Sequence, residues 1–341
     1  MGPGHKQTAS LVASAAIGLA SLSPFLGAAR DEFPSDPAGS ARPDLRHVVG
    51  PDECAGCHEL EAAVWEKTGH HTGGRDLARS DEARTIATAL GIRRLKTEDR
   101  CTACHFTVRE SHKGDLETIS GVSCESCHGP GDAWIDLHPP MASETAPERA
   151  LRLKRCDQLG MRRPAQLYDL ASSCYGCHVI TDEEVVNTGG HPAVVGLDLV
   201  AGTQGSLRHN YVRGDEGTNA VSALERRRVM FVLGHALTLE HTLRALARST
   251  QEGPYRDGML ESVRAARAAL TEVQLVLPLE LVATILESSR AFDVNPAVIP
   301  MPAELNCLAD EVGATTRAFE RGHDGTELGA LDPLLPVVQR E

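Results

Sequence analysis

The sequence predicts a mainly α-helical protein, and three observations lead to its architecture. Helical periodicity takes over from about residue 222 and continues toward the C-terminus. An earlier stretch, residues 60–68, is amphipathic with the spacing of a short helix. Short cysteine–histidine motifs occupy the first half, while aromatic residues make up only 4% of the chain. Because aromatic side chains supply much of the apolar contact in globular cores, something else is expected to fill part of this interior.

Length and charge limit the class of protein. The 341 residues are enough for two domains of ordinary size. The 34 Lys and Arg residues against 47 Asp and Glu residues give a net charge of −13. Such an acidic chain is a poor match for nucleic acid, so no nucleic-acid partner is expected.

The N-terminus has the form of a secretory signal peptide, residues 1–29. A short polar start with Lys6 precedes an almost uncharged run from Thr8 to Gly27, and Gly27 and Ala29 form a small-residue cleavage site. The alternative is an uncleaved membrane anchor, for which about 20 apolar residues suffice. Because the run is rich in serine and ends in small residues, we expect cleavage. The mature chain would then be periplasmic or secreted, without stable membrane insertion.

Eight of the ten cysteines fall into one pentapeptide pattern that occurs four times. Motifs 1 to 4 are Cys54-Ala-Gly-Cys57-His58, Cys101-Thr-Ala-Cys104-His105, Cys124-Glu-Ser-Cys127-His128 and Cys174-Tyr-Gly-Cys177-His178. C-x-x-C-H is the attachment signature of c-type haem. The two cysteines reach the two vinyl groups of one porphyrin and form thioethers, and the following histidine becomes the proximal iron ligand. The sequence therefore predicts four covalently attached haems.

Two other uses of paired cysteines are zinc binding and disulfide formation. Zinc leaves the four motif histidines unexplained, and a chain with room for a large core does not need four disulfides. Haem accounts for the cysteines and histidines together. It also explains the low aromatic content, because side chains pack against porphyrins. We therefore predict haem iron as the cofactor, and we expect the haem-free segment to fold poorly.

Ten histidines outside the motifs and the signal peptide are candidates for the distal iron ligands. They are His47, His70, His71, His112, His138, His191, His209, His235, His241 and His323. Three of them, His70, His138 and His191, lie on turn-rich segments close to a motif, where a loop can project a side chain toward a neighbouring iron. His209 is the predicted fourth ligand, with His47 and His112 as alternatives. His71 is expected to be a neighbour of a ligand.

The motif region resembles the cytochrome c-554 family of tetrahaem c-type cytochromes over roughly residues 50–195. Motif 1 followed by Trp65, Thr68, Gly69 and His70 is similar to the opening of that family's sequences. The stretch from Gly121 to Gly131, with His138 downstream, is similar to the family's third haem segment.

This resemblance implies a compact cluster of stacked haems in a largely helical domain with little sheet. It implies that most irons carry two histidine ligands, with His70 and His138 matching distal ligands and His191 matching less closely. It also implies that the iron on His105 lacks a sixth ligand, which would leave His209 without that role. An iron with an open position binds small molecules, whereas an iron with two histidines only carries electrons.

The C-terminal part, residues 216–341, has the periodicity of a small helical bundle. Ser222-Ala-Leu-Glu225 predicts a capping box that opens a helix through Arg248. Residues 255–274 and 279–292 predict two more helices, and Pro302 suits the first turn of a fourth that ends near Gly322. His235 and His241 on the first helix are expected to be structural.

Two further features stay open at the level of sequence. Cys156 and Cys307 lie outside the motifs, and they either form a disulfide or remain free thiols. The tract 148–163 is locally basic, and it is either a solvated surface or a docking patch for an acidic partner.

We therefore predict an exported tetrahaem cytochrome with a signal peptide (1–29), a tetrahaem cytochrome c domain (30–215) and a helical C-terminal domain (216–341). After the haem maturation machinery has acted, it would transfer electrons between periplasmic redox proteins that serve as donor and acceptor. No side-chain catalyst is needed, so an electron carrier is favoured over an enzyme. One alternative is reduction or binding of nitric oxide, or a related nitrogen oxide, at a five-coordinate haem. The other is an interaction module that acts through the helical domain.

Overall fold

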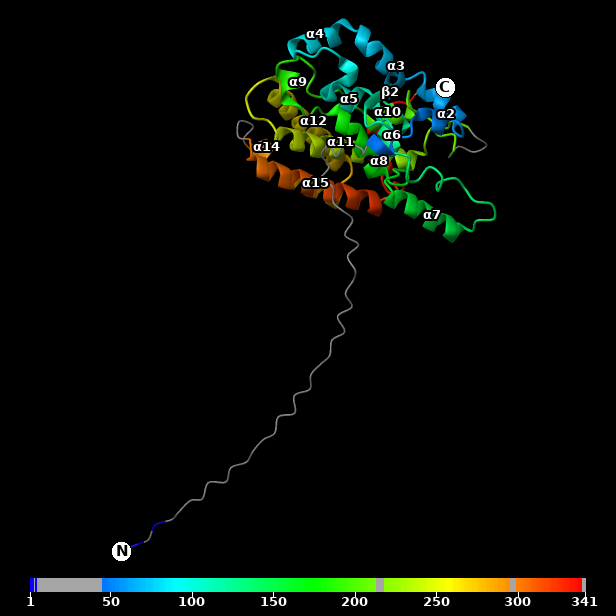
Figure 1. Ribbon diagram of the computed structural model, residues 1–341. Helices are drawn as coiled ribbons and strands as arrows, with labels where there is room; N and C mark the ends of the chain where they lie inside the picture. The colour runs from blue at the N-terminus through cyan, green and yellow to red at the C-terminus, as the bar shows by residue number, and fades with distance from the viewer. Residues whose placement is uncertain (3, 5–44, 213–217, 295–298, 339–341) are drawn as a thin grey trace. The chain divides into compact units, whose positions relative to one another are not determined.

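The computed structural model describes residues 1, 2, 4, 45–212, 218–294 and 299–338. The predicted signal peptide lies outside these ranges apart from three residues at its start. The described residues from 45 onward form one compact unit. Most of its described residues are helical, and the sheet found among them has two strands (Figure 1). The predicted mainly α fold with little sheet is therefore confirmed.

Short helices make up the first part of this unit. They are α1 (Pro51–Ala55), α2 (Glu59–Trp65), α3 (Gly69–Asp76), α4 (Asp81–Ala89), α5 (Asp99–His105), α6 (Cys124–His128), α7 (Ala146–Gln158), α8 (Leu167–His178), α9 (Glu183–Asn187) and α10 (Leu199–Gln204), with 3-10 turns at Leu45–His47, Leu77–Arg79 and Leu95–Thr97. Helices of this length are not stable alone in water. They depend on what they pack against.

The two-stranded hairpin joins motifs 2 and 3. Strands β1 (Thr107–Glu110) and β2 (Leu116–Ser120) are antiparallel, with Thr107 opposite Ser120. The Thr107 hydroxyl lies 2.7 Å from the Gly121 carbonyl oxygen and 2.8 Å from the Ser123 hydroxyl. These contacts hold the end of α5 against the start of α6, so the two motifs are neighbours in space.

Longer helices form the C-terminal part, close to the predicted bounds. They are α11 (Leu224–Leu246), α12 (Pro254–Val276), α13 (Glu280–Ser288), the short α14 (Ala291–Val294) and α15 (Pro302–Gly322), followed by a 3-10 turn at Gly329–Leu334. None of the helices in the described ranges combines enough length and apolar character to cross a bilayer.

Two local predictions for these helices are wrong. Ser222 does not cap α11, because Ala223 takes the N-cap position and the Ser222 amide donates to the Gln204 side chain at 2.8 Å. The helix predicted over 279–292 is interrupted after Ser288. There the Arg267 guanidinium donates to the Leu286 carbonyl at 2.9 Å and contacts the Ser289 hydroxyl, and such side-chain bonds compete with the helical ladder.

The hydrophobic core is confined to one part of the unit. Its cluster of buried residues begins at Leu167 on α8 and continues through α10, α11, α12, α13 and α15. Among the described residues before Leu167, buried hydrophobic side chains are few, such as Phe106 and Trp134, and none belongs to this cluster. We call residues 45–166 the coreless segment and residues 167–338 the core segment. The core runs across residue 216, and the domain boundary there stays a prediction.

Candidate haem sites

Motifs 2, 3 and 4 lie on helices, and motif 1 begins on α1 and ends in the turn before α2. The histidine is the last residue of its helix in motifs 2, 3 and 4, on α5, α6 and α8, and in motif 1 it directly precedes α2. Cysteines three residues apart lie on the same face of a helix. The two thiols of motifs 2, 3 and 4 therefore share a face on which one porphyrin edge would attach, with the histidine beside them to hold the iron.

The four motif histidines each face one histidine from elsewhere in the chain. The ring centroids are 6.0 Å apart for His58 and His138, 6.3 Å for His178 and His70, 6.2 Å for His105 and His191, and 6.2 Å for His128 and His209. Since a metal–imidazole bond is about 2 Å long, two imidazoles on opposite sides of one iron have centroids about 6 Å apart. The spacing at every motif therefore fits a haem iron between two histidines.

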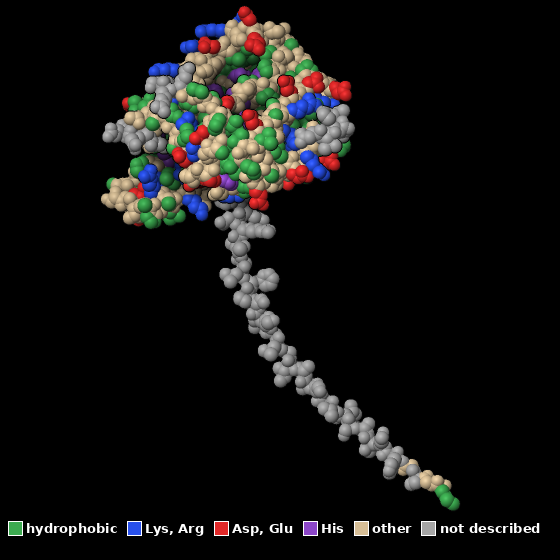
Figure 2. Space-filling model, turned by 180° about the vertical axis from the view of Figure 1, so that it is seen from behind, with side chains coloured by type: hydrophobic (Ala, Val, Ile, Leu, Met, Phe, Trp, Pro, Cys, Tyr) green, Lys and Arg blue, Asp and Glu red, His purple; other side chains and the backbone are tan. Residues whose placement is uncertain are grey.

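Backbone carbonyls orient five of these eight rings. The Nδ1 atom lies near a carbonyl oxygen in His128 (Arg162, 2.9 Å), His138 (Ile135, 2.6 Å), His178 (Val195, 3.2 Å), His191 (Pro192, 2.8 Å) and His209 (Leu207, 2.5 Å). A carbonyl only accepts, so Nδ1 carries the proton and the other nitrogen is left to bind metal. This is the usual arrangement of metal-binding histidines. Figure 2 shows histidine side chains recessed in a hollow on one face of the molecule.

Burial keeps several of these imidazoles neutral. Desolvation lowers the pKa of His70 and His105, with a smaller contribution from the facing histidine in each case. Desolvation also lowers the pKa of His128 to about 4. Neutral imidazole is the form that ligates a metal, so these rings need not lose a proton at neutral pH to do so.

Contacts between motif cysteines define a spatial order. Cys54 of motif 1 lies close to Cys124 of motif 3 where α1 packs on α6, and Cys177 of motif 4 lies close to Cys104 of motif 2 where α8 packs on α5. Cys127 of motif 3 interacts electrostatically with Cys174 of motif 4. The attachment points therefore follow one another as 1–3–4–2.

A buried ion pair holds the loop that carries His138. Arg152 on α7 pairs with Glu144 at 2.6 Å, and their side chains are 4% and 5% exposed. The same guanidinium donates to the carbonyls of His138 at 2.5 Å and Leu137 at 3.2 Å. Removing this cation would leave Glu144 buried without a partner and two carbonyls without a donor.

A buried carboxylate inside motif 3 holds the chain that leads into motif 1. Glu125 is 2% exposed and accepts backbone N–H groups from Val49, Gly50 and Gly131 at 2.7–2.9 Å. A Cβ atom at Gly131 would lie 3.2 Å from this carboxylate, so the close approach favours glycine. Sequence reasoning missed this residue, although an acid between two haem cysteines was a visible signal.

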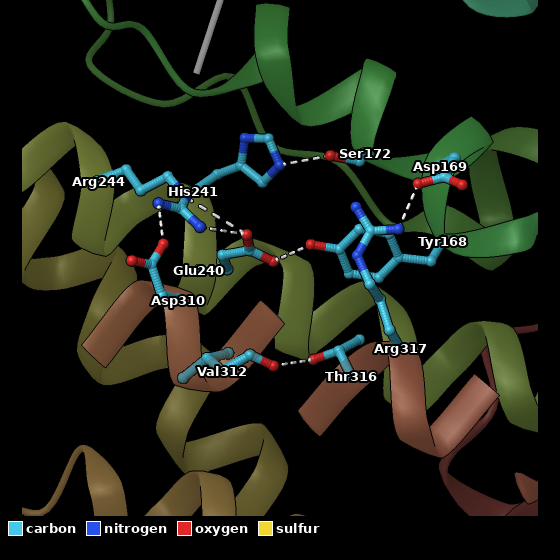
Figure 3. A network of polar contacts seen from close by, with 10 residues as sticks. All are labelled: Tyr168, Asp169, Ser172, Glu240, His241, Arg244, Asp310, Val312, Thr316 and Arg317. Atoms are coloured by element: carbon cyan, nitrogen blue, oxygen red, sulfur yellow. Dashed lines mark hydrogen bonds and ion pairs between the residues drawn. The ribbon is translucent and has the colours of Figure 1, made fainter. Parts of the chain in front are cut away.

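Motif 4 is attached to the helical bundle by the polar network of Figure 3. Tyr168 on α8 donates to Glu240 on α11 at 2.5 Å, and Arg244 donates to the same carboxylate at 2.9 Å. Burial raises the pKa of Glu240. Arg317 on α15 stacks on the Tyr168 ring at 3.8 Å and bonds to Asp169. The helix that carries motif 4 is thus fixed to both α11 and α15.

The remaining histidines have other neighbours. His241 lies 2.9 Å from the Ser172 hydroxyl, and His235 packs against Phe231. His47 lies 3.0 Å from Asp132, and His71 meets the Trp65 ring edge-on. Cys156 is a buried free thiol and Cys307 an exposed one. Within the described ranges, no group of three or more His, Cys, Asp or Glu is arranged to hold a metal ion.

C-x-x-C-H motifs that attach haem covalently define the class of c-type cytochromes, and the four motifs of this chain have that pattern. Residues 53–129 match the family described as cytochrome c554 and c-prime. Cytochrome c-554 of Nitrosomonas europaea (strain ATCC 19718 / CIP 103999 / KCTC 2705 / NBRC 14298) is 27% identical over 141 residues, which cover 38% of this chain and 57% of that protein. No solved structure matches the chain. The resemblance to the cytochrome c-554 family is therefore confirmed, and the family match itself covers motifs 1 to 3.

Proposed function

We propose that the chain is an exported tetrahaem c-type cytochrome that transfers electrons between periplasmic redox proteins. The observation that carries this proposal is the pairing of all four motif histidines with a second histidine at 6.0–6.3 Å. The proposed distal ligands are His138, His191, His209 and His70, for motifs 1, 2, 3 and 4 in that order. Two axial imidazoles leave an iron no position for a small molecule, so this set favours carriage over catalysis.

His191 bears most directly on the nitric oxide alternative. The family resemblance implies an open iron at motif 2, but His191 lies opposite His105 there, with its Nδ1 atom 2.8 Å from the Pro192 carbonyl oxygen. An oriented imidazole at this distance would close the iron. The enzyme alternative therefore has less support than the carrier.

Bound haem supplies the reversible Fe(III)/Fe(II) couple. The chain's own residues fix the spacing and orientation of the four sites. The order 1–3–4–2 of the attachment points makes motifs 1 and 2 the two ends of the row. Donor and acceptor are expected to approach these ends, after the maturation machinery has formed the thioethers.

We propose helix α7 as the surface that binds a redox partner at the end of the row where motif 1 lies. Figure 1 shows α7 standing out from the rest of the unit. Its Leu151 side chain is 71% exposed, and exposed Arg149, Lys154 and Arg155 lie on the same helix. Redox partners bind weakly through small interfaces steered by charge. A basic helix on an acidic protein fits a partner with an acidic surface.

The decisive test is electron paramagnetic resonance of the oxidised, haem-loaded protein, with and without nitric oxide, together with a haem count. We expect four haems per chain, low-spin signals from all of them and no change on adding the gas. A high-spin signal that nitric oxide removes would transfer the assignment to the small-molecule alternative. Fewer than four haems would contradict the tetrahaem assignment.

A further inference from the structure

Arg162, in the turn after α7, binds motif 3 through both its main chain and its side chain. Its amide donates to the His128 carbonyl at 2.8 Å, and its own carbonyl oxygen lies 2.9 Å from His128 Nδ1. Its guanidinium donates from Nε to the Cys127 carbonyl at 2.8 Å and from a terminal nitrogen to the Ser126 carbonyl at 3.2 Å. The positive charge is therefore held at a fixed place beside the attachment helix.

This charge faces two motifs at once. Besides Cys127, the guanidinium interacts electrostatically with Cys174 and Cys177 of motif 4. Burial lowers the pKa of Arg162, yet an arginine stays protonated in a protein. Among the described residues it forms no ion pair, and its acidic neighbour Asp169 is bonded to Arg317. In contrast, the adjacent Arg163 is neutralised by Asp157 at 2.6 Å.

The position of the guanidinium relative to the cysteines decides whether a bound haem would cancel its charge. Thioethers form at the vinyl edge of the porphyrin, whereas the propionates project from the opposite edge. A cation beside Cys127 and Cys174 is thus far from the propionates of the haems that these cysteines attach. The Glu125 carboxylate, the buried acid of motif 3, is bound by the N–H groups of Val49 and Gly50 ahead of motif 1 and of Gly131 after motif 3, and it forms no ion pair with Arg162.

We propose that the Arg162 guanidinium raises the reduction potentials of the haems attached by motifs 3 and 4. Electrons would then reside preferentially on these two haems, which lie in the middle of the row 1–3–4–2. The inference rests on the proposed function. Reduction adds one electron to each iron and removes one unit of positive charge from the site. A nearby fixed cation therefore favours the ferrous form, and it does so more strongly at low dielectric.

The test is a potentiometric titration of the haem-loaded protein with mediators and dithionite as the reductant, followed by visible absorption. In Arg162→Gln we expect two of the four midpoints to fall, with the ferrous-to-ferric ratio of those haems about tenfold lower at a fixed potential, which is about 59 mV for one electron. The double variant Arg163→Gln, Asp157→Asn is the matched control, because it removes the adjacent ion pair without changing the net charge, and its midpoints should equal those of the wild type. Arg162→Lys keeps the charge and should stay close to the wild type.

Three results would overturn the inference. They are unchanged midpoints in a fully loaded Arg162→Gln protein, an equal fall in the double variant Arg163→Gln, Asp157→Asn, and a fall in Arg162→Lys as large as in Arg162→Gln. If Arg162→Gln does not bind four haems, the test rests on Arg162→Lys. Lowered midpoints in Arg162→Lys, which keeps the positive charge, would then reject a role for that charge. Haem count and spin state, measured on the same samples, separate these results from a failure of the proposed electron-carrier function.

Discussion

The coreless segment and the core segment are built by different physical means. The core segment buries apolar side chains from helices α8 to α15 in one cluster, so it resembles an ordinary helical domain. The coreless segment contains three of the four motifs and almost no shared apolar contact. Its helices are joined by the hairpin, the Arg152–Glu144 pair and the Glu125 carboxylate. The difference indicates that porphyrins would serve as the hydrophobic interior of the first segment.

The largest expected effect is the loss of the coreless segment without haem. In a chain with all eight motif cysteines replaced by serine, we expect rapid backbone hydrogen exchange across residues 45–166 and slow exchange in α11, α12 and α15. The reason is that only the core segment buries enough apolar area by itself. Equally slow exchange in both segments would show that the coreless segment folds without haem, and would contradict this prediction. The haem-loaded protein is the control.

Truncation of a buried side chain tests the packing of the core segment directly. Leu237 on α11 is 0% exposed, and Leu237→Ala should lower the free energy of unfolding of the core segment by about 2–5 kcal/mol. Leu275→Ala, at a side chain that is 80% exposed, should change it by less than about 0.5 kcal/mol. Urea denaturation followed by circular dichroism measures both. Equal losses would show that α11 is not the centre of this core.

Buried His241 makes the core segment sensitive to acid. Desolvation lowers its pKa to about 4 from an ordinary value near 6.5, so the unfolded chain binds a proton that the folded chain does not. Stability should therefore fall as the pH drops from about 6.5 to 4 and level off below, by up to about 3 kcal/mol. His241→Gln, which removes the titratable group, should reduce this slope in urea unfolding across that range. The same slope in both proteins would contradict the assignment to His241.

Loss of Arg152 should affect one haem of the coreless segment. Arg152→Met removes the donor to the His138 carbonyl and leaves Glu144 buried alone, so the loop that carries this distal ligand is released. We expect one of four haems to become high-spin in the paramagnetic resonance spectrum. Lys154→Met, on the exposed side of the same helix, should leave all four low-spin. Four low-spin haems in Arg152→Met would mean that the loop holds His138 without this pair.

The smallest effect concerns the surface of α7. In the double variant Lys154→Glu, Arg155→Glu we expect reduction by dithionite, an anionic reagent, to slow by roughly threefold at low salt. The difference should disappear at high salt, because exposed charges are screened. Stopped-flow absorption measures the rate. The control is Arg290→Glu, at an exposed arginine between α13 and α14. An equal slowing in the control would reflect net charge rather than this helix.

Local signals in the sequence were sufficient for much of this structure. The mainly α fold, the bounds of the C-terminal helices and the four motifs follow from periodicity and spacing, which act within a few residues. The histidines predicted as distal ligands all face motif histidines, but the sequence could not pair them, since each pair joins distant segments. Arg152, Arg162 and Glu240 were missed as structural groups for the same reason. Ser222 shows the converse, because a long-range bond to Gln204 overrode a local capping pattern.

The position of motif 4 on α8 has a consequence for biogenesis. Synthesis runs from the N-terminus, so the segment without a core is made first and the helices that bury α8 are made last. Motifs 1 to 3 leave the ribosome long before any apolar scaffold exists to enclose them. In the proposed cytochrome they would therefore be available as extended chain to the machinery that joins cysteines to porphyrin. Motif 4 lies on a helix that the bundle itself positions, and it would offer the earlier haems a surface on which to assemble.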